Sequence, residues 1–137
     1  ITHLFLNLMK ITKMNKKIKI YTSYFAKSKI IPEDIIKISI CRFAPKGYKG
    51  IQFKKLAPSY NILMEYKEKK DQENYINRFN NEILNKINPQ NIYYELINIT
   101  NGCDCVLLCY EKTGHFCHRN LVSKWLAKNL NITIKEW

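Results

Sequence analysis

Asp104-Cys-Val-Leu-Leu-Cys-Tyr110 is a nearly continuous apolar run, and it decides the fold class. Such a run suits a strand that is covered on both faces, as in a parallel sheet. An amphipathic segment follows from His118 to Asn129, and Ile132 to Trp137 has the pattern of a last strand. Strand, helix and strand in this order form a right-handed crossover unit. The sequence therefore predicts an α/β fold with a mainly parallel sheet in a Rossmann-like three-layer arrangement.

Two further strands are expected upstream. Lys16 to Tyr24 alternates charged and apolar residues before it becomes aromatic, which is typical of a strand. Ile35 to Phe43 is rich in β-branched residues and predicts a second strand. A loop with Pro45, Gly47 and Gly50 follows. Together with the two carboxyl-terminal strands, these segments predict a small sheet of about four strands flanked by helices.

Three helices are expected between residues 59 and 102. Their predicted N-caps are Ser59, Asp71 and Asn88. Asn88 is followed by proline at the first helical position, and Asn101-Gly102 is a typical helix stop. The third segment has an alternative interpretation as a strand, because Ile92-Tyr93-Tyr94 has β propensity.

The chain of 137 residues is long enough for one domain with a real core. It begins with Ile1, and Met14 followed by Asn-Lys-Lys-Ile-Lys-Ile reads like a natural start. We therefore expect residues 14–137 to form a single α/β domain. Residues 1–13 are expected to be an upstream extension or leader, with an amphipathic docking segment as the alternative.

The charge is strongly basic, with 23 Lys and Arg against 11 Asp and Glu, or +12. Such an excess favours phosphate-bearing partners, although a lysine-rich surface is also expected from an AT-rich genome. The basic segment between residues 37 and 55 holds six cations, and no acidic residue occurs from Ile35 to Met64. These cations are Lys37, Arg42, Lys46, Lys49, Lys54 and Lys55, interleaved with Phe43, Tyr48, Phe53 and, just beyond the segment, Tyr60. This mixture is typical of nucleic-acid binding, and a solvated lysine-rich loop is the alternative.

Four of the five cysteines lie between Cys103 and Cys117. No secretory signal precedes them, and no apolar run approaches the roughly 18 residues of a membrane span. We therefore expect reduced thiols in a cytoplasmic protein without membrane contact. Cys103 and Cys105 alternate on one strand face and are expected to pack as small hydrophobes.

The loop Glu111-Lys-Thr-Gly-His-Phe-Cys-His-Arg119 follows the apolar strand directly. Ligands of open α/β sheets bind outside the carboxyl ends of the strands, where this loop must lie. Cys117 begins a helix, and a helix N-terminus lowers the pKa of a thiol and attracts anions. Cys117 is therefore a candidate nucleophile, and Glu111 a candidate acid or base or a partner that holds Arg119 in place.

Two motifs with defined residue spacing, a phosphatase loop and a zinc site, bear on this loop. Phosphatase-type loops need a cysteine five residues before an arginine, but nine residues separate Cys109 from Arg119 and one separates Cys117 from it. Zinc needs about four nitrogen or sulfur ligands. The loop and strand hold enough such atoms but no Cys-x-x-Cys pair, so no metal or other cofactor is expected and a structural zinc site stays an alternative.

The residues from Val106 to Glu111, then Cys117-His-Arg119, then Leu121-Val122 and Trp125-Leu126 resemble the signature of the domain of unknown function 488 family. Weaker similarity extends upstream over Ile20-Tyr-Thr-Ser23, Ile40-Cys-Arg42 and Leu56-Ala-Pro-Ser59. The resemblance covers about residues 17–137. It implies a small cytoplasmic α/β domain found in bacteria and phage. It also implies a ligand or active site at Cys109, Glu111, Cys117, His118 and Arg119, without naming a reaction.

These observations predict a site that binds or processes a phosphate-bearing ligand, either a nucleotide or a nucleic acid. Glu111, Cys117 and His118 are the candidate catalytic residues, and Arg42 and Arg119 the candidate anion-binding residues. The candidate pocket-lining residues are Tyr21, Ser23, Tyr24 and Cys109. The alternatives are a non-catalytic nucleic-acid-binding module that uses the basic segment, and a domain stabilised by zinc.

Overall fold

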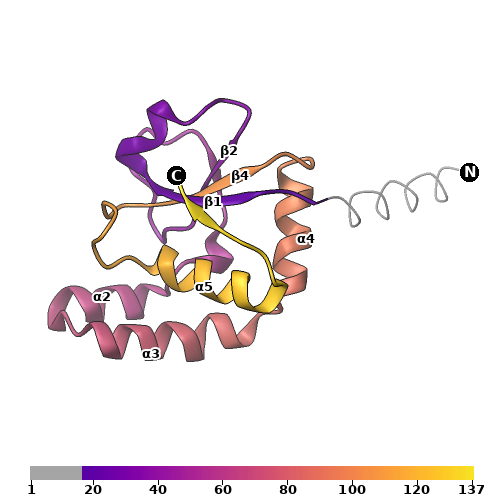
Figure 1. Cartoon of the computed structure of the whole chain (residues 1–137). Helices are drawn as coiled ribbons and strands as arrows, with labels where there is room; N and C mark the ends of the chain where they lie inside the picture. The colour runs from indigo at the N-terminus through magenta and orange to yellow at the C-terminus, as the bar shows by residue number, and fades with distance from the viewer. Residues whose placement is uncertain (1–16) are drawn as a thin grey trace, which may run out of the picture.

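The computed structural model describes residues 17–137, and the predictions for residues 1–13 lie outside the described residues. Five strands form one parallel sheet in the order β3-β2-β4-β1-β5 (Figure 1). They are β1 (Ile20–Tyr24), β2 (Ile36–Ser39), β3 (Ile51–Gln52), β4 (Cys105–Cys109) and β5 (Lys135–Glu136). The predicted α/β class with a parallel sheet flanked by helices is confirmed.

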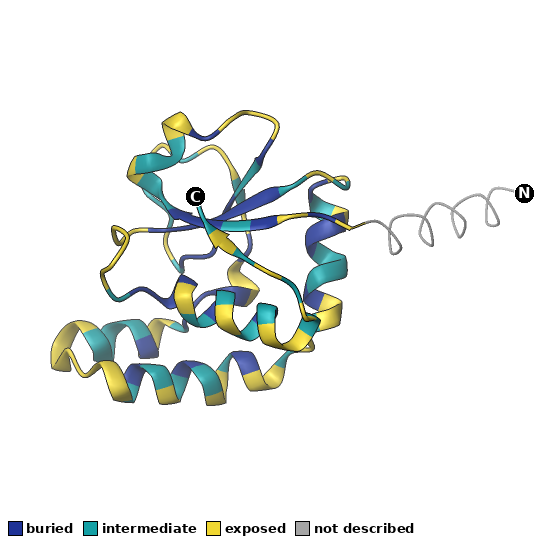
Figure 2. Cartoon of the chain, viewed as in Figure 1, coloured by how far each residue is buried: buried dark blue, intermediate teal, exposed yellow. Residues whose placement is uncertain are grey.

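The central strand is β4, which pairs with β1 on one side and β2 on the other. All five of its residues are buried (Figure 2). An apolar run without alternation is what a strand needs when protein covers both of its faces. The run that decided the fold class therefore became the middle of the sheet.

The strand count and two strand lengths differ from expectation. A fifth strand, β3, lies in the segment predicted as a loop, where Ile51 pairs with Ile38. The strand predicted from Ile35 to Phe43 ends at Ser39, and the last strand contains only Lys135–Glu136. Strands of two residues are too short to show a period, and it is the neighbouring strand that induces them.

Within residues 17–137, four α-helices account for most of the chain outside the sheet. They are α2 (Tyr60–Lys69), α3 (Gln72–Glu82), α4 (Pro89–Ile99) and α5 (His118–Leu130), with three short 3-10 helices η1 (Phe25–Ile30), η2 (Lys54–Leu56) and η3 (Leu84–Lys86). All three predicted N-caps are confirmed, because the side chains of Ser59, Asp71 and Asn88 each accept a backbone N–H three residues ahead.

The α4 segment is a helix, so its alternative interpretation as a strand is wrong. The Asn88 cap and Pro89 start it, and its buried side chains Ile92, Leu96 and Ile97 face the core. Its last residue is Ile99, and the turn that follows is closed by Gly102, whose N–H donates to the carbonyl of Ile97 and whose φ is 80°. Glycine adopts this left-handed conformation without a steric cost.

Alternate residues of the strands enter two separate apolar clusters. Ile20, Ile38 and Leu107 join the larger cluster, to which α2, α3, α4 and α5 all contribute. Val106 and Leu108 point the other way, into a smaller cluster beside η1 that includes Tyr21, Phe25 and Trp137 in its rim. The sheet is thus the middle of three layers, with the α-helices on one face and η1 on the other (Figure 1). No helix of residues 17–137 is long and apolar enough to span a membrane.

The larger cluster predicts a test of stability. Ile38 is fully buried in it, whereas Ile30 at the end of η1 is 71% exposed. Ile38→Ala is expected to lower the free energy of unfolding by about 2–5 kcal/mol, through lost burial and the cavity left behind. Ile30→Ala is the matched control and is expected to change it by less than about 0.5 kcal/mol. Urea denaturation measures both, and equal effects would contradict the described core.

Candidate functional site

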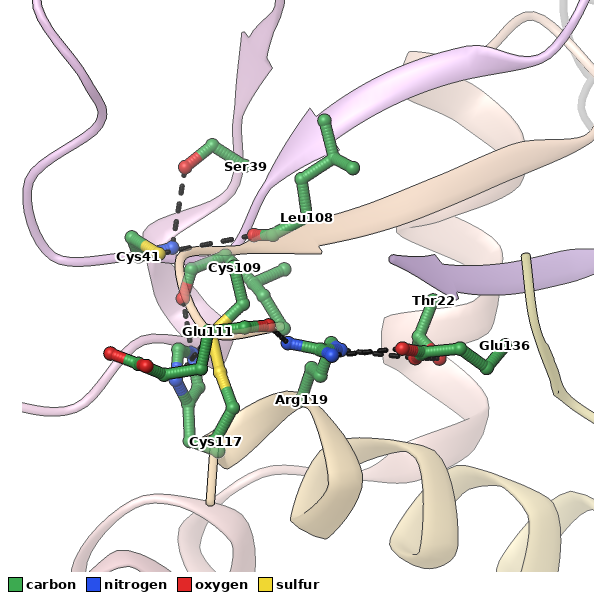
Figure 3. Close-up of a disulfide and its surroundings, with 11 residues drawn as sticks. Thr22, Ser39, Cys41, Leu108, Cys109, Glu111, Cys117, Arg119 and Glu136 are labelled. Atoms are coloured by element: carbon green, nitrogen blue, oxygen red, sulfur yellow. Dashed lines mark hydrogen bonds and ion pairs between the residues drawn. A yellow bond between two sulfur atoms is a disulfide. The ribbon is translucent and has the colours of Figure 1, made fainter. Parts of the chain in front are cut away.

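The carboxyl ends of β2 and β4 meet the start of α5 at one edge of the sheet. Cys41 lies two residues beyond β2, Cys109 ends β4, and Cys117 is the N-cap residue of α5. The three are buried and pack together, with Phe25 at their border (Figure 3). Burial raises the pKa of the Cys41 thiol to about 12, so this residue stays protonated and acts as part of the packing.

Cys109 and Cys117 are joined as a disulfide (Figure 3). The expectation that these thiols are reduced is therefore wrong for this pair. Eight positions separate the two cysteines along the chain. Their meeting depends on how the irregular loop between β4 and α5 returns to the sheet, which spacing does not reveal.

His118 lies beside these sulfurs with both ring nitrogens engaged. Its Nε2 is 2.6 Å from the carbonyl oxygen of Ile40, and its Nδ1 is 3.5 Å from Sγ of Cys109. A carbonyl can only accept, so Nε2 carries the hydrogen and Nδ1 presents its lone pair to the sulfur side. Burial lowers the pKa of His118 to about 4, the bond to Ile40 opposes this shift, and the charge of Arg119 reinforces it. The imidazole is consequently neutral at pH 7.

Arg119 is completely buried at the first turn of α5. Its Nε and Nη2 donate to Oε1 and Oε2 of Glu136 at 3.0 and 2.8 Å, a bidentate ion pair. Its Nη1 donates to the backbone carbonyl of Glu111, and its guanidinium lies 5.9 Å from the centre of the Tyr24 ring. An unpaired charge at this depth would cost several kcal/mol, so Glu136 is essential to the local structure.

Glu136 is a partner that the sequence reasoning missed. It lies on β5 and also accepts hydrogen bonds from the hydroxyls of Thr22 at 2.8 Å and Thr113 at 2.7 Å. Burial by itself raises the pKa of Glu136, but the hydrogen bonds from Arg119, Thr113 and Thr22 outweigh it and hold the pKa below its usual value. Glu136 could have been considered from the sequence, because a buried arginine requires a carboxylate and Glu136 is an acidic residue in a predicted strand.

Glu111 contributes its backbone to this arrangement, and its side chain is exposed. In Figure 3 its carboxylate extends away from Arg119, while its carbonyl faces the guanidinium. The alternative in which the Glu111 carboxylate holds Arg119 is therefore wrong, since Glu136 has that role. As a candidate acid or base, Glu111 is positioned at the solvent side of the loop.

Arg42 follows Cys41 directly and lines a cavity of about 600 Å³. Its Nε donates to the carbonyl of Pro58 at 2.8 Å, which fixes the side chain. Lys54, Lys55 and Lys86 line the same cavity. Other cations of the basic segment, Lys37 and Lys49, line a second cavity beside Tyr48 and Gly50. Cations of the basic segment are thus divided between two surfaces, and Arg42 belongs to the first.

The four predicted pocket-lining residues have different surroundings, and neither of these two cavities includes them. Tyr21 packs edge-on against Trp137, and Tyr24 lies below Arg119. Ser23 is fully buried, and its hydroxyl has no hydrogen-bond partner among residues 17–137. Cys109 adjoins Cys117 and His118, and the pocket role of all four residues stays a prediction.

A comparison with protein families decides the assignment. The family model described as DUF488-N3a, Active DUF488-N3 subclade, matches residues 20–130, from the first residue of β1 to the last of α5. The chain belongs to the DUF488 family. The resemblance drawn from the Cys-Tyr-Glu and Cys-His-Arg residues is thereby confirmed, and Glu136 lies outside the matched span of this DUF488 domain. No curated protein and no solved structure matches the chain significantly.

The same cluster of the DUF488 domain contains three side chains of the types that ligate metal ions. The ligand atoms of Cys109, Cys117 and His118 lie within 4.8 Å of one another, and all three residues are buried. Two thiolates and an imidazole suit zinc, which takes about four ligands in a closed structural site. Of the two other cysteines near β4, Cys105 packs in the core as expected. Cys103 is exposed, because it lies before the first residue of β4, and the expectation that it is buried is wrong.

Because the Arg119–Glu136 pair is buried, replacing Glu136 by Gln should destabilise the protein more than the same substitution at a surface ion pair. Glu136→Gln leaves a buried guanidinium without a counter-charge and is expected to lower the free energy of unfolding at pH 7 by about 3 kcal/mol. Glu82→Gln, the matched control, breaks an ion pair of Arg78 at the surface and is expected to lower the free energy of unfolding much less, because solvent screens that pair.

The effect of Glu136→Gln on the free energy of unfolding is expected to depend on pH. A carboxylate with a lowered pKa contributes stability above its unfolded pKa of about 4.3, and the contribution is lost as the pH falls through the folded value. The gap between wild type and Glu136→Gln is therefore expected to close in acid. Urea curves at pH 7 and pH 3 measure it, and a gap as large at pH 3 as at pH 7 would contradict the assignment.

His118 predicts an acid-sensitive step at higher pH. Because its folded pKa is about 4 and its unfolded pKa about 6.5, stability is complete above pH 6.5 and falls as the pH drops towards 4. His118→Gln retains a donor for the Ile40 carbonyl and removes this titration. Urea denaturation in reductant at pH 7.5 and pH 5 is expected to show a smaller loss for this variant than for wild type. His115→Gln, at an exposed histidine of the same loop, should leave the loss unchanged.

Proposed function

We propose that this DUF488 domain binds and acts on a phosphate-bearing ligand, a nucleotide or a nucleic acid, at the carboxyl edge of its sheet. Cys117, His118 and Glu111 are the reacting groups in this proposal, and Arg42 is the surface contact for the anion. The observation that carries it is the neutral imidazole of His118, whose Nδ1 carries no hydrogen and lies 3.5 Å from Sγ of Cys109, the sulfur that Cys117 adjoins.

The chemistry of the reduced pair follows from this placement. The lone pair on Nδ1 of His118 accepts a thiol proton, and the carbonyl of Ile40 keeps the ring in the tautomer that can do so. Cys117 also precedes the first turn of α5, a helix of 13 residues, whose positive N-terminal end stabilises a thiolate. A cysteine with a neighbouring base and a favourable field is an activated nucleophile.

The affinity for phosphate rests on charge near the same edge. Arg42 lies next to the cysteine cluster in the chain and shares its cavity with Lys54, Lys55 and Lys86. Arg119 contributes its charge from the interior, where Glu136 and the Glu111 carbonyl occupy its donors. In the proposal Arg42 makes the outer contact, while Arg119 reaches the anion only when it exchanges a donor from Glu136.

The matched family is described as an active subclade of DUF488-N3, which supports catalysis rather than binding alone. Glu111, with its carboxylate on the solvent side of the loop, is the group that can exchange a proton with a ligand bound there. If the protein binds such a ligand without converting it, the alternative of a non-catalytic nucleic-acid-binding module applies instead.

A zinc centre is the second candidate, favoured by the three buried donors Cys109, Cys117 and His118. It would stabilise the loop and leave the thiolates as ligands rather than nucleophiles. Elemental analysis of protein purified in reductant separates the two candidates, because the zinc candidate requires about one equivalent of metal that disappears in Cys117→Ser.

The leading proposal predicts the behaviour of two variants. The reduced protein is titrated calorimetrically with nucleoside mono-, di- and triphosphates and with a single-stranded oligonucleotide of 12 residues. Arg42→Gln is expected to weaken the tightest of these interactions by about tenfold or more, the value of one charge-assisted hydrogen bond to phosphate. Cys117→Ser is expected to bind as wild type does but to leave the bound compound unchanged by mass spectrometry, because a serine hydroxyl is not ionised there.

Lys128→Gln removes one charge from the last turn of α5 and is the control for Arg42→Gln. The proposal is wrong if the wild type binds none of these compounds, or if Arg42→Gln binds them as well as Lys128→Gln does. Unchanged conversion by Cys117→Ser would remove the nucleophile from it.

A further inference from the structure

Three exposed aromatic side chains lie together at the carboxyl edge of the sheet. Phe43, Tyr60 and Tyr110 are 52%, 56% and 50% exposed. The rings of Phe43 and Tyr60 are 6.2 Å apart, and the hydroxyl of Tyr110 donates to the carbonyl of Phe43 at 2.7 Å. We call these three residues the aromatic patch. Large exposed aromatic groups that are held in place usually mark a binding surface.

The aromatic patch is supported from below. Phe25 packs edge-on against Tyr110 with ring centres 5.0 Å apart, and Tyr60 is the first residue of α2, next to the Ser59 cap. The hydrogen bond from Tyr110 to Phe43 links the segments that follow β4 and β2. The rings are therefore presented on fixed elements, which reduces the entropy lost when a flat group stacks on them.

Cations adjoin the aromatic patch on one side. Arg42 precedes Phe43 and is fixed to the carbonyl of Pro58, two residues before Tyr60. Arg42 lines the 600 Å³ cavity together with Lys54 and Lys86. Among residues 17–137, no ion pair is recorded for these three cations.

The acidic side chains of the same cavity are fewer than its cations. Glu82 pairs with Arg78 and is also near Lys86, and Glu95 pairs with Lys55 at 2.6 Å. Four cations, Arg42, Lys54, Lys55 and Lys86, line the cavity against these two carboxylates, so it has an excess of positive charge. A cationic groove beside exposed rings matches a chain of phosphates that carries flat, unpaired bases.

We infer that the phosphate-bearing ligand is a single-stranded nucleic acid. Its bases stack on the aromatic patch, and its phosphates bind Arg42, Lys54 and Lys86. A duplex does not fit this surface, because its base faces are covered by their neighbours. The inference rests on the proposed function and specifies its ligand. Tyr110 follows Cys109 and Arg42 follows Cys41, so a base stacked on the aromatic patch would contact residues that adjoin the cysteine cluster.

Fluorescence anisotropy tests the inference with a labelled 12-residue oligothymidylate, the same strand in a duplex with oligoadenylate, and thymidine monophosphate as competitor. The single strand is expected to bind at least about tenfold more tightly than the duplex. Phe43→Ala, Tyr60→Ala and Tyr110→Ala are each expected to weaken it by about fivefold or more, the effect of one lost stacking contact. Tyr60→Phe retains the ring and should restore binding.

The cations are tested through salt. The slope of log affinity against log salt is expected to become flatter by about 0.7 in each of Lys54→Gln and Lys86→Gln, one phosphate contact on a single strand. Ile30→Ala and Lys128→Gln are the controls for an exposed apolar group and for a lost charge away from the groove, and should bind as wild type does.

Three results would overturn the inference: equal affinity for duplex and single strand, wild-type affinity in the aromatic variants, or an unchanged salt slope in both lysine variants. If thymidine monophosphate or another nucleotide binds through Arg42 while the oligonucleotide binds no more tightly, the inference fails and the proposed function stands. If nothing binds, both fail.

Discussion

The guanidinium of Arg119 carries a full charge in the interior, and the surrounding structure depends on how that charge is neutralised. Glu136 supplies both carboxylate oxygens from β5, and the Glu111 carbonyl supplies a third acceptor from the loop. Thr22 on β1 and Thr113 in the loop then bond the same carboxylate. One ion pair thereby connects α5 to β5, to β1 and to the loop that contains Cys117. Removing either partner exposes the other to the full cost of a buried charge.

The cysteine and histidine cluster gains its geometry from this connection. Arg119 fixes the first turn of α5, and His118 in the same turn reaches the Ile40 carbonyl just beyond β2. That bond chooses the tautomer of the ring and so decides which nitrogen faces the sulfurs. A reactive thiol beside a neutral base is thus a consequence of how a helix start docks on two strand ends.

The sequence predicted those parts of the molecule that depend on local pattern. The buried run ending at Tyr110 became the central strand, and the side-chain caps at Ser59, Asp71 and Asn88 started the helices as expected. Position in the sheet also follows from pattern, because strand ends of a parallel sheet share one edge.

The parts that the sequence did not predict are all contacts between distant segments. The pairing of β3 with β2 involves two residues, and the identity of the acid that neutralises Arg119 depends on which strand lies beside α5. Glu111 was the nearer acid in sequence, yet its side chain faces solvent. Likewise, whether Cys109 meets Cys117 depends on the path of an irregular loop. Local propensity contains no information on such pairings, which tertiary packing decides.

The position of Glu136 in the chain affects the order in which the fold is completed. Arg119 is synthesised 17 residues before its counter-charge, after β1, β2 and β4 are already present. Until Glu136 arrives, burying the first turn of α5 would bury an unpaired charge. In a growing chain α2, α3 and α4 can therefore pack on the sheet before Glu136 is made, whereas we expect the loop and the start of α5 to become ordered last. The segment that contains Cys117, His118 and Arg119 is thus the segment whose folding depends on β5.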